Sequence, residues 1–503
     1  MGEAQLLLFE PTFNRSVKVR SRDDRLTSDA GALLLREADH QLGLSESLAS
    51  RIQDPRDSAK TRYKVVELLR ERIYALALGY SAADDLDVLA HDPAMKAAVW
   101  DRPGDQVLEE RLASQPTHSR LIDILAWKHN TEAVRSALAD WVERHLRASG
   151  RDQRVLRGTI DVDGLPVYVH GSQPGSRFNG YYQEKVYSPL VASFSPEGDY
   201  DATRLGSGFV HAILRAGNAA PAEGALRFML TAYKRCRRLA RVIDFRLDAG
   251  FTEGHVMDGL KERGIRFVGR LRSNKVLQEL AAPHVRRPVG RPPSEGYEYT
   301  VELGWYQAET WRQPQRLVLV VVDKPDPKTG QLELFPHYFF LVTSWRENEK
   351  DGVELLNHYR NRGTFEDRFG ELNEAIGANL SHPRFEENEA AFLVHLLAMN
   401  HASMLRSEME AATGSGWDLA RLQHSVLRAG ARVVKGQRRL WIDVAQAVVV
   451  LWHLLLDRIE RWCPSPLWPL PKGPRKKPIA PKFRWIVHSG PTASPETSLR
   501  LPR

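Results

Sequence analysis

Three acidic residues of the chain are placed where they could hold a divalent metal ion. Asp163 and Asp248 each end a short run of apolar and β-branched residues, which is typical of a buried strand. Glu366 lies in a run with helical spacing. Because ligands of open sheets gather at the carboxyl ends of strands, we expect the three carboxylates to converge there. Hard oxygen ligands of this kind suit Mg²⁺, with Mn²⁺ as a substitute, and a pair of such ions suits cleavage of a phosphodiester bond.

The run that contains Glu366 carries two further polar side chains on the same predicted face. Tyr359, Arg362 and Glu366 are separated by three and four positions, which places them on one stripe of a helix. A phenol and a guanidinium beside a carboxylate suit a phosphate bound next to a metal. The alternative is a solvated helix on which Arg362 and Glu366 form an ion pair one turn apart.

Two other aspartates compete for the metal. Asp161 points to the same side of its strand as Asp163, because side chains alternate, so the strand period does not choose between them. Asp244 lies inside its strand, whereas Asp248 lies at the strand end. We choose Asp163 and Asp248 because both end their strands, although a single aspartate at a strand end is usually a turn or cap residue.

The elements around these residues are expected to form a mixed α/β sheet. The predicted strands are 158–163, 167–170, 187–194, 241–248 and 265–271, and the predicted helices between them are 222–239 and 253–263. Strands followed by alternating helix and strand are the order of an RNase H-like sheet, of the kind found in retroviral integrases, with helices on its faces. In that order Asp163 and Asp248 end adjacent central strands.

Shifts in composition divide the chain into segments around this core. Helical periodicity dominates before it, strand-like runs interrupt it after 272, and proline and basic residues dominate the end. The predicted parts are a mainly helical N-terminal region at 1–150, the first part of the core at 151–272, an inserted β-subdomain at 273–333, the rest of the core with the glutamate helix at 334–410, C-terminal helices at 411–462 and a basic tail at 463–503.

Charge and cysteine content limit the possible partners. The 503 residues include 71 Lys+Arg against 63 Asp+Glu, a net charge of +8, which favours a polyanion over an acidic small molecule. The two cysteines, Cys236 and Cys463, lack partners at metal-ligand spacing, so neither a zinc site nor a disulfide framework is implied. No apolar run reaches the ~20 residues of a membrane helix. These features predict a cytoplasmic protein without membrane partner or organic cofactor.

One N-terminal helix is a candidate for reading DNA. The run 114–120 resembles a cap before a new helix, with Ser114 or Thr117 able to accept backbone hydrogen bonds. His118, Ser119 and Arg120 at the helix start would then face base edges, and Thr117 is a further candidate for DNA contact. An ordinary capped helix explains the same residues equally well.

The sequences of these segments and their order along the chain resemble those of the DDE transposases of bacterial insertion sequences. The resemblance is to the group whose glutamate lies in a Tyr-x2-Arg-x3-Glu-x6-Lys signature. The closest match within that group is the insertion-sequence family thirteen-eighty. The resemblance covers roughly residues 26–404, and the segments that carry it are 26–31, 112–117, 170–171, 180–182, 246–251 and 340–344. It implies that Asp163, Asp248 and Glu366 are catalytic and hold two metal ions. It also implies that the N-terminal region, 1–150, is a DNA-end-binding region.

Two positions depart from the family pattern. Asn373 stands where the signature has its lysine, which leaves one phosphate contact neutral. Leu165 stands where a threonine or serine usually follows the first aspartate, which removes a hydroxyl near the first metal ligand. Neither departure touches the three carboxylates, so we expect activity to survive.

The resemblance also points to residues of the inserted segment. In related transposases such an insertion carries a tryptophan that stacks on a base flipped out of the transposon end. Trp311 is the first candidate and Trp305 the second, although packing is the commoner role for either. The run 286–293, which includes Arg291, is expected to be extended because of its prolines. It resembles an arginine hook for a narrow minor groove.

The resemblance implies cut-and-paste transposition by a homodimer that bridges two inverted-repeat ends and inserts them into target DNA. The protein is then expected to associate with the bacterial nucleoid. Two alternatives stay open: an RNase H-like nuclease that cuts without strand transfer, and a catalytically silent DNA-binding descendant. A missing joining product would favour the first, and DNA binding without cleavage would favour the second.

Overall fold

The computed structural model describes residues 7–14, 16–21, 24–149, 155–197, 206–287, 295–325, 332, 335–436 and 439–462, without the side chains of 364–366. These residues belong to one unit, Met1–Ser465. The basic tail predicted for 463–503 and the hook around Arg291 lie outside the described residues, so both stay predictions. Among the described helices, none combines the length and the apolar character needed to cross a membrane.

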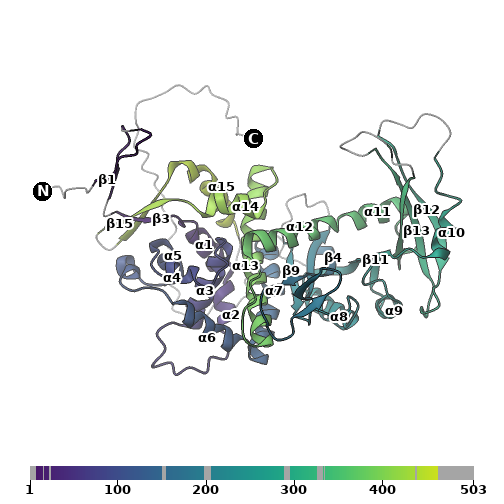
Figure 1. Ribbon diagram of the computed structural model, residues 1–503, viewed down its shortest axis with the longest axis horizontal. Helices are drawn as coiled ribbons and strands as arrows, with labels where there is room; N and C mark the ends of the chain where they lie inside the picture. Colours follow the sequence, from purple (N-terminus) through teal and green to yellow (C-terminus); the bar gives the residue numbers. More distant parts are fainter. Residues whose placement is uncertain are drawn as a thin grey trace. The chain divides into compact units, whose positions relative to one another are not determined.

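A large mixed sheet forms the centre of the fold (Figure 1). Its strand order is β12-β13-β14-β11-β10-β4-β8-β9, and β10 runs parallel to both of its neighbours while the other pairs are antiparallel. The strands are β4 (Val155–Gly164), β8 (Leu190–Glu197), β9 (Gly208–Ile213), β10 (Ala240–Leu247), β11 (Arg266–Leu271), β12 (Tyr297–Tyr306), β13 (Gln315–Asp323) and β14 (His337–Thr343). The prediction of a mixed α/β sheet is confirmed.

The two faces of the central strands differ in chemistry because side chains alternate along each strand. One face carries apolar side chains, such as Ile160 of β4 and Phe245 of β10, and packs against α8 (Ala225–Cys236) and α9 (Gly254–Lys261). The opposite face carries polar side chains and lies against α11 (Gly352–Arg360) and α12 (Gly363–Glu371). Helix α12 continues as a π-helical turn, Leu372–Ile376. Figure 1 shows α11 and α12 following one another along the sheet.

Helices from both ends of the chain surround one long helix. The 29-residue α13 (Phe385–Thr413) is buried over most of its length. It packs against α3 (Val65–Ala77), α7 (Lys128–Ala148) and α15 (Val449–Ile459). The N-terminal helices are α1 (Ala32–Leu42), α2 (Leu44–Ala49), α3 (Val65–Ala77), α4 (Asp85–Leu89), α5 (Pro93–Val99), η1 (Gly104–Leu108), α6 (Gln115–Leu125) and α7 (Lys128–Ala148). The N-terminal region is therefore mainly helical, as the sequence predicts.

Three segments differ from the predicted elements. The strand expected at 167–170 does not join the central sheet; β5 (Val167–Tyr168) pairs with β7 (Glu184–Tyr187), which also pairs with β6 (Arg177–Asn179). Segment 273–333 begins with α10 (Lys275–Ala281), and its two strands extend the central sheet itself through β14.

Segment 411–462 is only partly helical. It contains α14 (Leu419–Leu422), a π-helical turn (Gln423–Leu427), a 3-10 turn (Gln446–Val448) and α15 (Val449–Ile459), with a hairpin of β15 (Ala431–Gly436) and β16 (Arg439–Val444) between them. Strand β15 also pairs with β3 (Arg25–Thr27), near the other end of the chain, so the hairpin belongs to a three-stranded sheet. A further pair, β1 (Leu7–Phe9) and β2 (Val19–Arg20), precedes it.

Candidate active site

The structure brings Asp163 and Asp248 to the same edge of the sheet. Val162 of β4 is paired with Leu247 of the parallel strand β10, so the residues that follow them, Asp163 and Asp248, are neighbours. Both side chains are only partly buried. The two aspartates predicted from their strand-end positions therefore lie together and within reach of solvent.

The charge state of Asp163 reflects this crowded position. Burial raises its pKa to about 6, although Arg362 and the backbone N–H of Gly164 act in the opposite direction. The negative charge of Asp248 adds to the rise. A bound cation would relieve this repulsion, and an all-oxygen donor set matches the ligands that Mg²⁺ and Mn²⁺ prefer. The residues present at the sheet edge thus fit a divalent metal.

Arg362 occupies the junction between α11 and α12 and is buried. Its guanidinium donates a hydrogen bond to Oδ2 of Asp163, while Oδ1 of Asp163 accepts one from the backbone of Gly164 at 2.8 Å. The sequence predicts a phosphate contact for Arg362, and the structure shows a carboxylate contact in the same place. A phosphate held beside Asp163 would be within reach of this side chain.

The other residues of the signature lie on α11, on α12 and on the π-helical turn that follows α12. Tyr359 is half-buried near the end of α11, and Glu366 lies in α12, with its side chain outside the described part of the structure. The single helix expected from 359 to 366 is interrupted at Asn361 and Arg362. Asn373 is exposed on the π-helical turn after α12.

Asp161 is engaged by another residue. Arg246 of β10 grips it with two hydrogen bonds, 2.8 Å from Nε to Oδ1 and 2.6 Å from Nη2 to Oδ2, and both side chains are buried. A bidentate, buried pair of this kind is costly to open. The geometry therefore favours Asp163 over Asp161 as the residue available to a metal.

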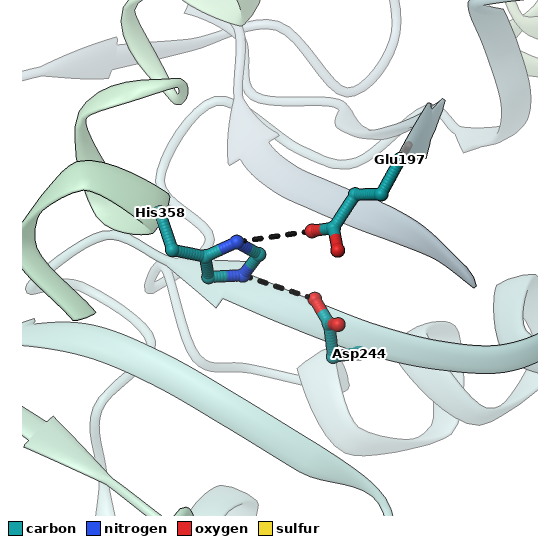
Figure 2. Close-up of side chains that lie close together, drawn as sticks. All are labelled: Glu197, Asp244 and His358. Carbon is teal, nitrogen blue, oxygen red and sulfur yellow. Dashed lines mark hydrogen bonds and ion pairs between the residues drawn. The ribbon is translucent and has the colours of Figure 1, made fainter. Parts of the chain in front are cut away.

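A second cluster of polar groups lies deeper on the same face. Nδ1 of His358 is 3.0 Å from Oε1 of Glu197, and Nε2 is 3.2 Å from Oδ1 of Asp244, so the ring lies between two carboxylates (Figure 2). Their ligand-type atoms all lie within 4.8 Å of one another. Because each ring nitrogen already faces a carboxylate, a metal held by His358 would have to displace one of these contacts.

Sequence reasoning did not single out Glu197 or His358, and it ranked Asp244 as a weak competitor for metal. One signal was present: Asp244 sits in the interior of a strand with apolar neighbours, where an unpaired charge is costly. Such a residue requires a partner, although the sequence does not say which.

The predicted recognition helix is α6, and most of it is part of the helical core. His118 is buried, with Nε2 at 3.1 Å from Glu71, and Ser119 is hydrogen-bonded to Gln115. Ser114 occupies the N-cap position, but in the described structure its side chain makes no capping hydrogen bond, contrary to the sequence expectation. Arg120 is exposed and Thr117 half-buried, so their contact with DNA stays a prediction.

The two candidate tryptophans have different surroundings. Trp311 is only 7% exposed, and its ring meets Tyr306 edge-on at 5.4 Å between centroids. Trp305 is 59% exposed, with the Lys261 ammonium 5.5 Å from its ring centroid. Trp305, the second candidate, is therefore the one with a surface open to a base.

The hairpin of β6 and β7, which carries Tyr181 and Tyr182 in its turn and is called the aromatic hairpin below, lies near the two aspartates. Burial and the charge of Asp163 raise the pKa of Tyr182, and the charge of Asp248 contributes as well, so the phenol lies near enough to be affected by both carboxylates. Tyr181 next to it is 87% exposed, and the same small sheet exposes Tyr168 and Phe178. The sequence identified 180–182 as a family-like segment without a role in the site.

Comparisons with known proteins give a similar solved structure and a matching family model. The chain is similar over 91% of its length to a solved piggyBac transposase synaptic complex with hairpin DNA, with 91% of that chain covered, 11% identity and a TM-score of 0.36. A search of curated proteins gives no match. The family model for the transposase DDE domain, group 1, matches residues 9–462. With nearly the whole described chain matched, the protein belongs to this family of DDE transposases.

Proposed function

We propose that the protein is the transposase of a bacterial insertion sequence of the family thirteen-eighty, and that it cuts the inverted-repeat ends and joins them to target DNA. The observation that supports this most directly is the pair Asp163 and Asp248 at neighbouring strand ends, with the helix of Glu366 on the same face of the sheet. The strand order of the central sheet also supports an RNase H-like core.

In this proposal Asp163, Asp248 and Glu366 hold two Mg²⁺ ions, which Mn²⁺ can replace. Such ions, when bound, lower the pKa of water and stabilise charge on the attacking and leaving oxygens of a phosphodiester. Arg362 lies against Asp163 and would bind the scissile phosphate with its planar fork. Tyr359 and Asn373 would contact the same DNA strand.

Several surfaces would hold the rest of the DNA. The exposed ring of Trp305 would stack on a base flipped out of the end, and the aromatic hairpin would line the path of the cut strand. Arg120, with Thr117 and Ser119, would contact the end sequence. A homodimer would bridge two ends, and the net charge of +8 supports a polyanionic partner.

The test is cleavage of DNA that carries the native flanks of the gene, with Mg²⁺, Mn²⁺ or chelator present. Wild-type protein is compared with Glu366→Gln and with Glu374→Gln, which makes the same change at an exposed position of the following π-helical turn. We expect metal-dependent nicks at the repeats and joined products from the wild type and from Glu374→Gln, and neither from Glu366→Gln.

Each other outcome has a defined meaning. Cleavage without joining would replace the proposal by a nuclease. Binding of the repeats without cleavage in any divalent metal would replace it by a silent DNA-binding protein. Cleavage that survives Glu366→Gln would remove the glutamate from the site.

A further inference from the structure

The cluster around His358 lies outside the proposed metal site, and its geometry is that of a clamp. His358 projects from α11 into the polar face of the sheet, where Glu197 of β8 and Asp244 of β10 take its two ring nitrogens (Figure 2). The imidazole is buried and its ring also meets Trp345 edge-on at 5.2 Å. One side chain therefore joins a helix to two strands of the sheet.

The number of protons available in the cluster decides which protonation state of His358 fits between Glu197 and Asp244. The hydroxyl of Thr159 lies 2.5 Å from Oε1 of Glu197 and 2.8 Å from Oδ1 of Asp244, the same two oxygens that face the imidazole. Thr159 supplies one proton, a neutral imidazole one and an imidazolium two. With neutral histidine, only two protons serve the four contacts; with imidazolium, three do. With both carboxylates ionised, the charged form is therefore the one that supplies a donor to each of them from the ring.

Other charged groups near the cluster agree with this assignment. Burial lowers the pKa of His358, but hydrogen bonds and charges from Asp244 and Glu197 outweigh it and the pKa is raised. Burial raises the pKa of Glu197, but His358, Thr159 and the charge of Lys350 lower it to about 2. Arg246, another nearby cation, is held by Asp161, and Arg157 and Arg266 line the same cavity as Glu197 and His358.

The clamp is connected to the proposed catalytic edge through short contacts. Nη1 of Arg246 donates to the backbone carbonyl of His358 at 3.1 Å, so the sheet holds both the side chain and the backbone of this residue. Arg362, four residues further along at the junction of α11 and α12, binds Asp163. Glu366 follows one turn after Arg362. A shift of α11 at His358 would therefore move both groups.

We propose that His358 is a positioning residue: its imidazolium, bridging Glu197 and Asp244, fixes α11 on the sheet and so sets Arg362 and the Glu366 helix over the carboxylate edge. The inference deepens the proposed function, on which its catalytic consequence rests. The clamp itself is a property of the fold.

The sign of the pH effect follows from the raised pKa. A histidine whose pKa in the folded protein exceeds its ordinary value of about 6.5 is bound most tightly at and below that value. The link is lost as pH rises through the folded pKa, because a neutral ring leaves two carboxylates with too few protons. The α11–α12 region should then loosen at alkaline pH.

Hydrogen exchange of residues 352–371 tests the clamp without requiring activity. From about pH 6 to about pH 10, we expect protection factors of this segment in the wild type to fall by about ten-fold or more, a loss equivalent to about 1.4 kcal/mol. His358→Gln should show the low protection at every pH. The matched control is His145→Gln, which removes another buried histidine, 3.1 Å from Glu408, and should leave 352–371 unchanged.

A milder variant keeps the inference testable where His358→Gln does not fold. Glu197→Gln removes one of the two carboxylates that demand the imidazolium, so the loss of protection should move to lower pH by about one unit. Protection of 352–371 that is independent of pH in the wild type, or a midpoint unmoved by Glu197→Gln, would overturn the clamp.

DNA cleavage supplies a second, separable readout. If the wild type cleaves its ends, His358→Gln should cut at least about ten-fold more slowly while binding the ends with unchanged affinity, and Glu197→Gln should shift the alkaline limb of the pH profile. A rate and pH profile like those of the wild type in both variants would remove His358 from a positioning role. If the wild type cuts no DNA, the proposed function fails, and hydrogen exchange still decides the clamp.

Discussion

The two faces of the central sheet show two ways in which the same strands are held. On one face Ile160 and Phe245 pack against α8 and α9, where burial of apolar surface stabilises the fold without regard to direction. On the other face Arg246, which is paired with Asp161, donates to the backbone of His358 in α11, and Arg368 of α12 donates to Ser193 of β8, through hydrogen bonds of fixed geometry. Apolar packing holds the sheet together, while the polar contacts fix the orientation of the helices that carry the proposed catalytic groups.

The largest expected effect removes a proposed metal ligand. Asp248→Asn should reduce end cleavage by about three orders of magnitude or more, because the site loses one of its charged oxygens. The melting temperature should change little, since the side chain is only partly buried. Cleavage assays and thermal unfolding check this, with Asp457→Asn at an exposed position of α15 as the control. Full activity of Asp248→Asn would contradict the assignment.

On the apolar face, Phe245→Ala should cost about 3–5 kcal/mol in free energy of unfolding, because it leaves a cavity between β10 and α8. Urea unfolding measures the loss. Any fall in cleavage should follow the fraction of unfolded protein. A loss of cleavage in fully folded protein would show that the apolar face also contributes directly to the site.

On the polar face, Arg246→Met should cost a similar amount, about 3–5 kcal/mol, because it leaves Asp161 buried without its cation. The double variant Asp161→Leu with Arg246→Met should recover most of this stability. Its cleavage should stay low, since the bond from Arg246 to the backbone of His358 is lost in both. Recovery of both properties would show that the polar contacts do not orient the helices.

The charge of Asp163 gives the folded protein a pH dependence. Its pKa of about 6 lies above the ordinary value of 3.8, so the folded state keeps a proton that the unfolded state has released. Stability should therefore decline from about pH 4 to about pH 6, by about 1–3 kcal/mol. Urea midpoints in chelator measure the decline, which Asp163→Asn should remove. Equal slopes for the two proteins would contradict the raised pKa.

The smallest effect concerns the exposed tryptophan. Trp305→Ala should slow the joining of cut ends by about ten-fold, since stacking of an aromatic ring on a base contributes about 1–3 kcal/mol. Initial nicking should be unchanged. Trp127→Ala, which removes another exposed tryptophan, is the control. Equal joining rates for both variants would show that Trp305 is an exposed residue without a role in joining.

Local patterns were sufficient to predict much of the sheet. The strands that end in Asp163 and Asp248 alternate apolar with polar residues, as in Ile160-Asp161-Val162 and Phe245-Arg246-Leu247, and their order along the chain predicts adjacent positions. Contacts between distant segments were not predictable in this way. His358 is 114 residues from Asp244, and the sequence gives no sign that the two meet.

The tryptophans illustrate the same limit. Trp311 and Trp305 lie only six positions apart in the sequence, but Trp311 packs against Gly254 at the start of α9, where a larger side chain would collide with its ring. Burial therefore depended on a residue from another element. Similarly, the segment of β15 and β16 was expected to be helical. Its strand β15 pairs with β3, which lies about 400 residues earlier in the chain, and local sequence does not show that partner.

The pairing of β3 with β15 has a consequence for the order of events during synthesis. The core around α13 gathers residues from Ala32 to Trp462, so the first helices to leave the ribosome lack their packing partners until almost the whole chain has been made. At about 5–20 residues per second, that interval lasts tens of seconds. Throughout it the apolar faces of these early helices stay open to chaperones and to aggregation, and a transcript cut short before β15 yields no complete N-terminal core.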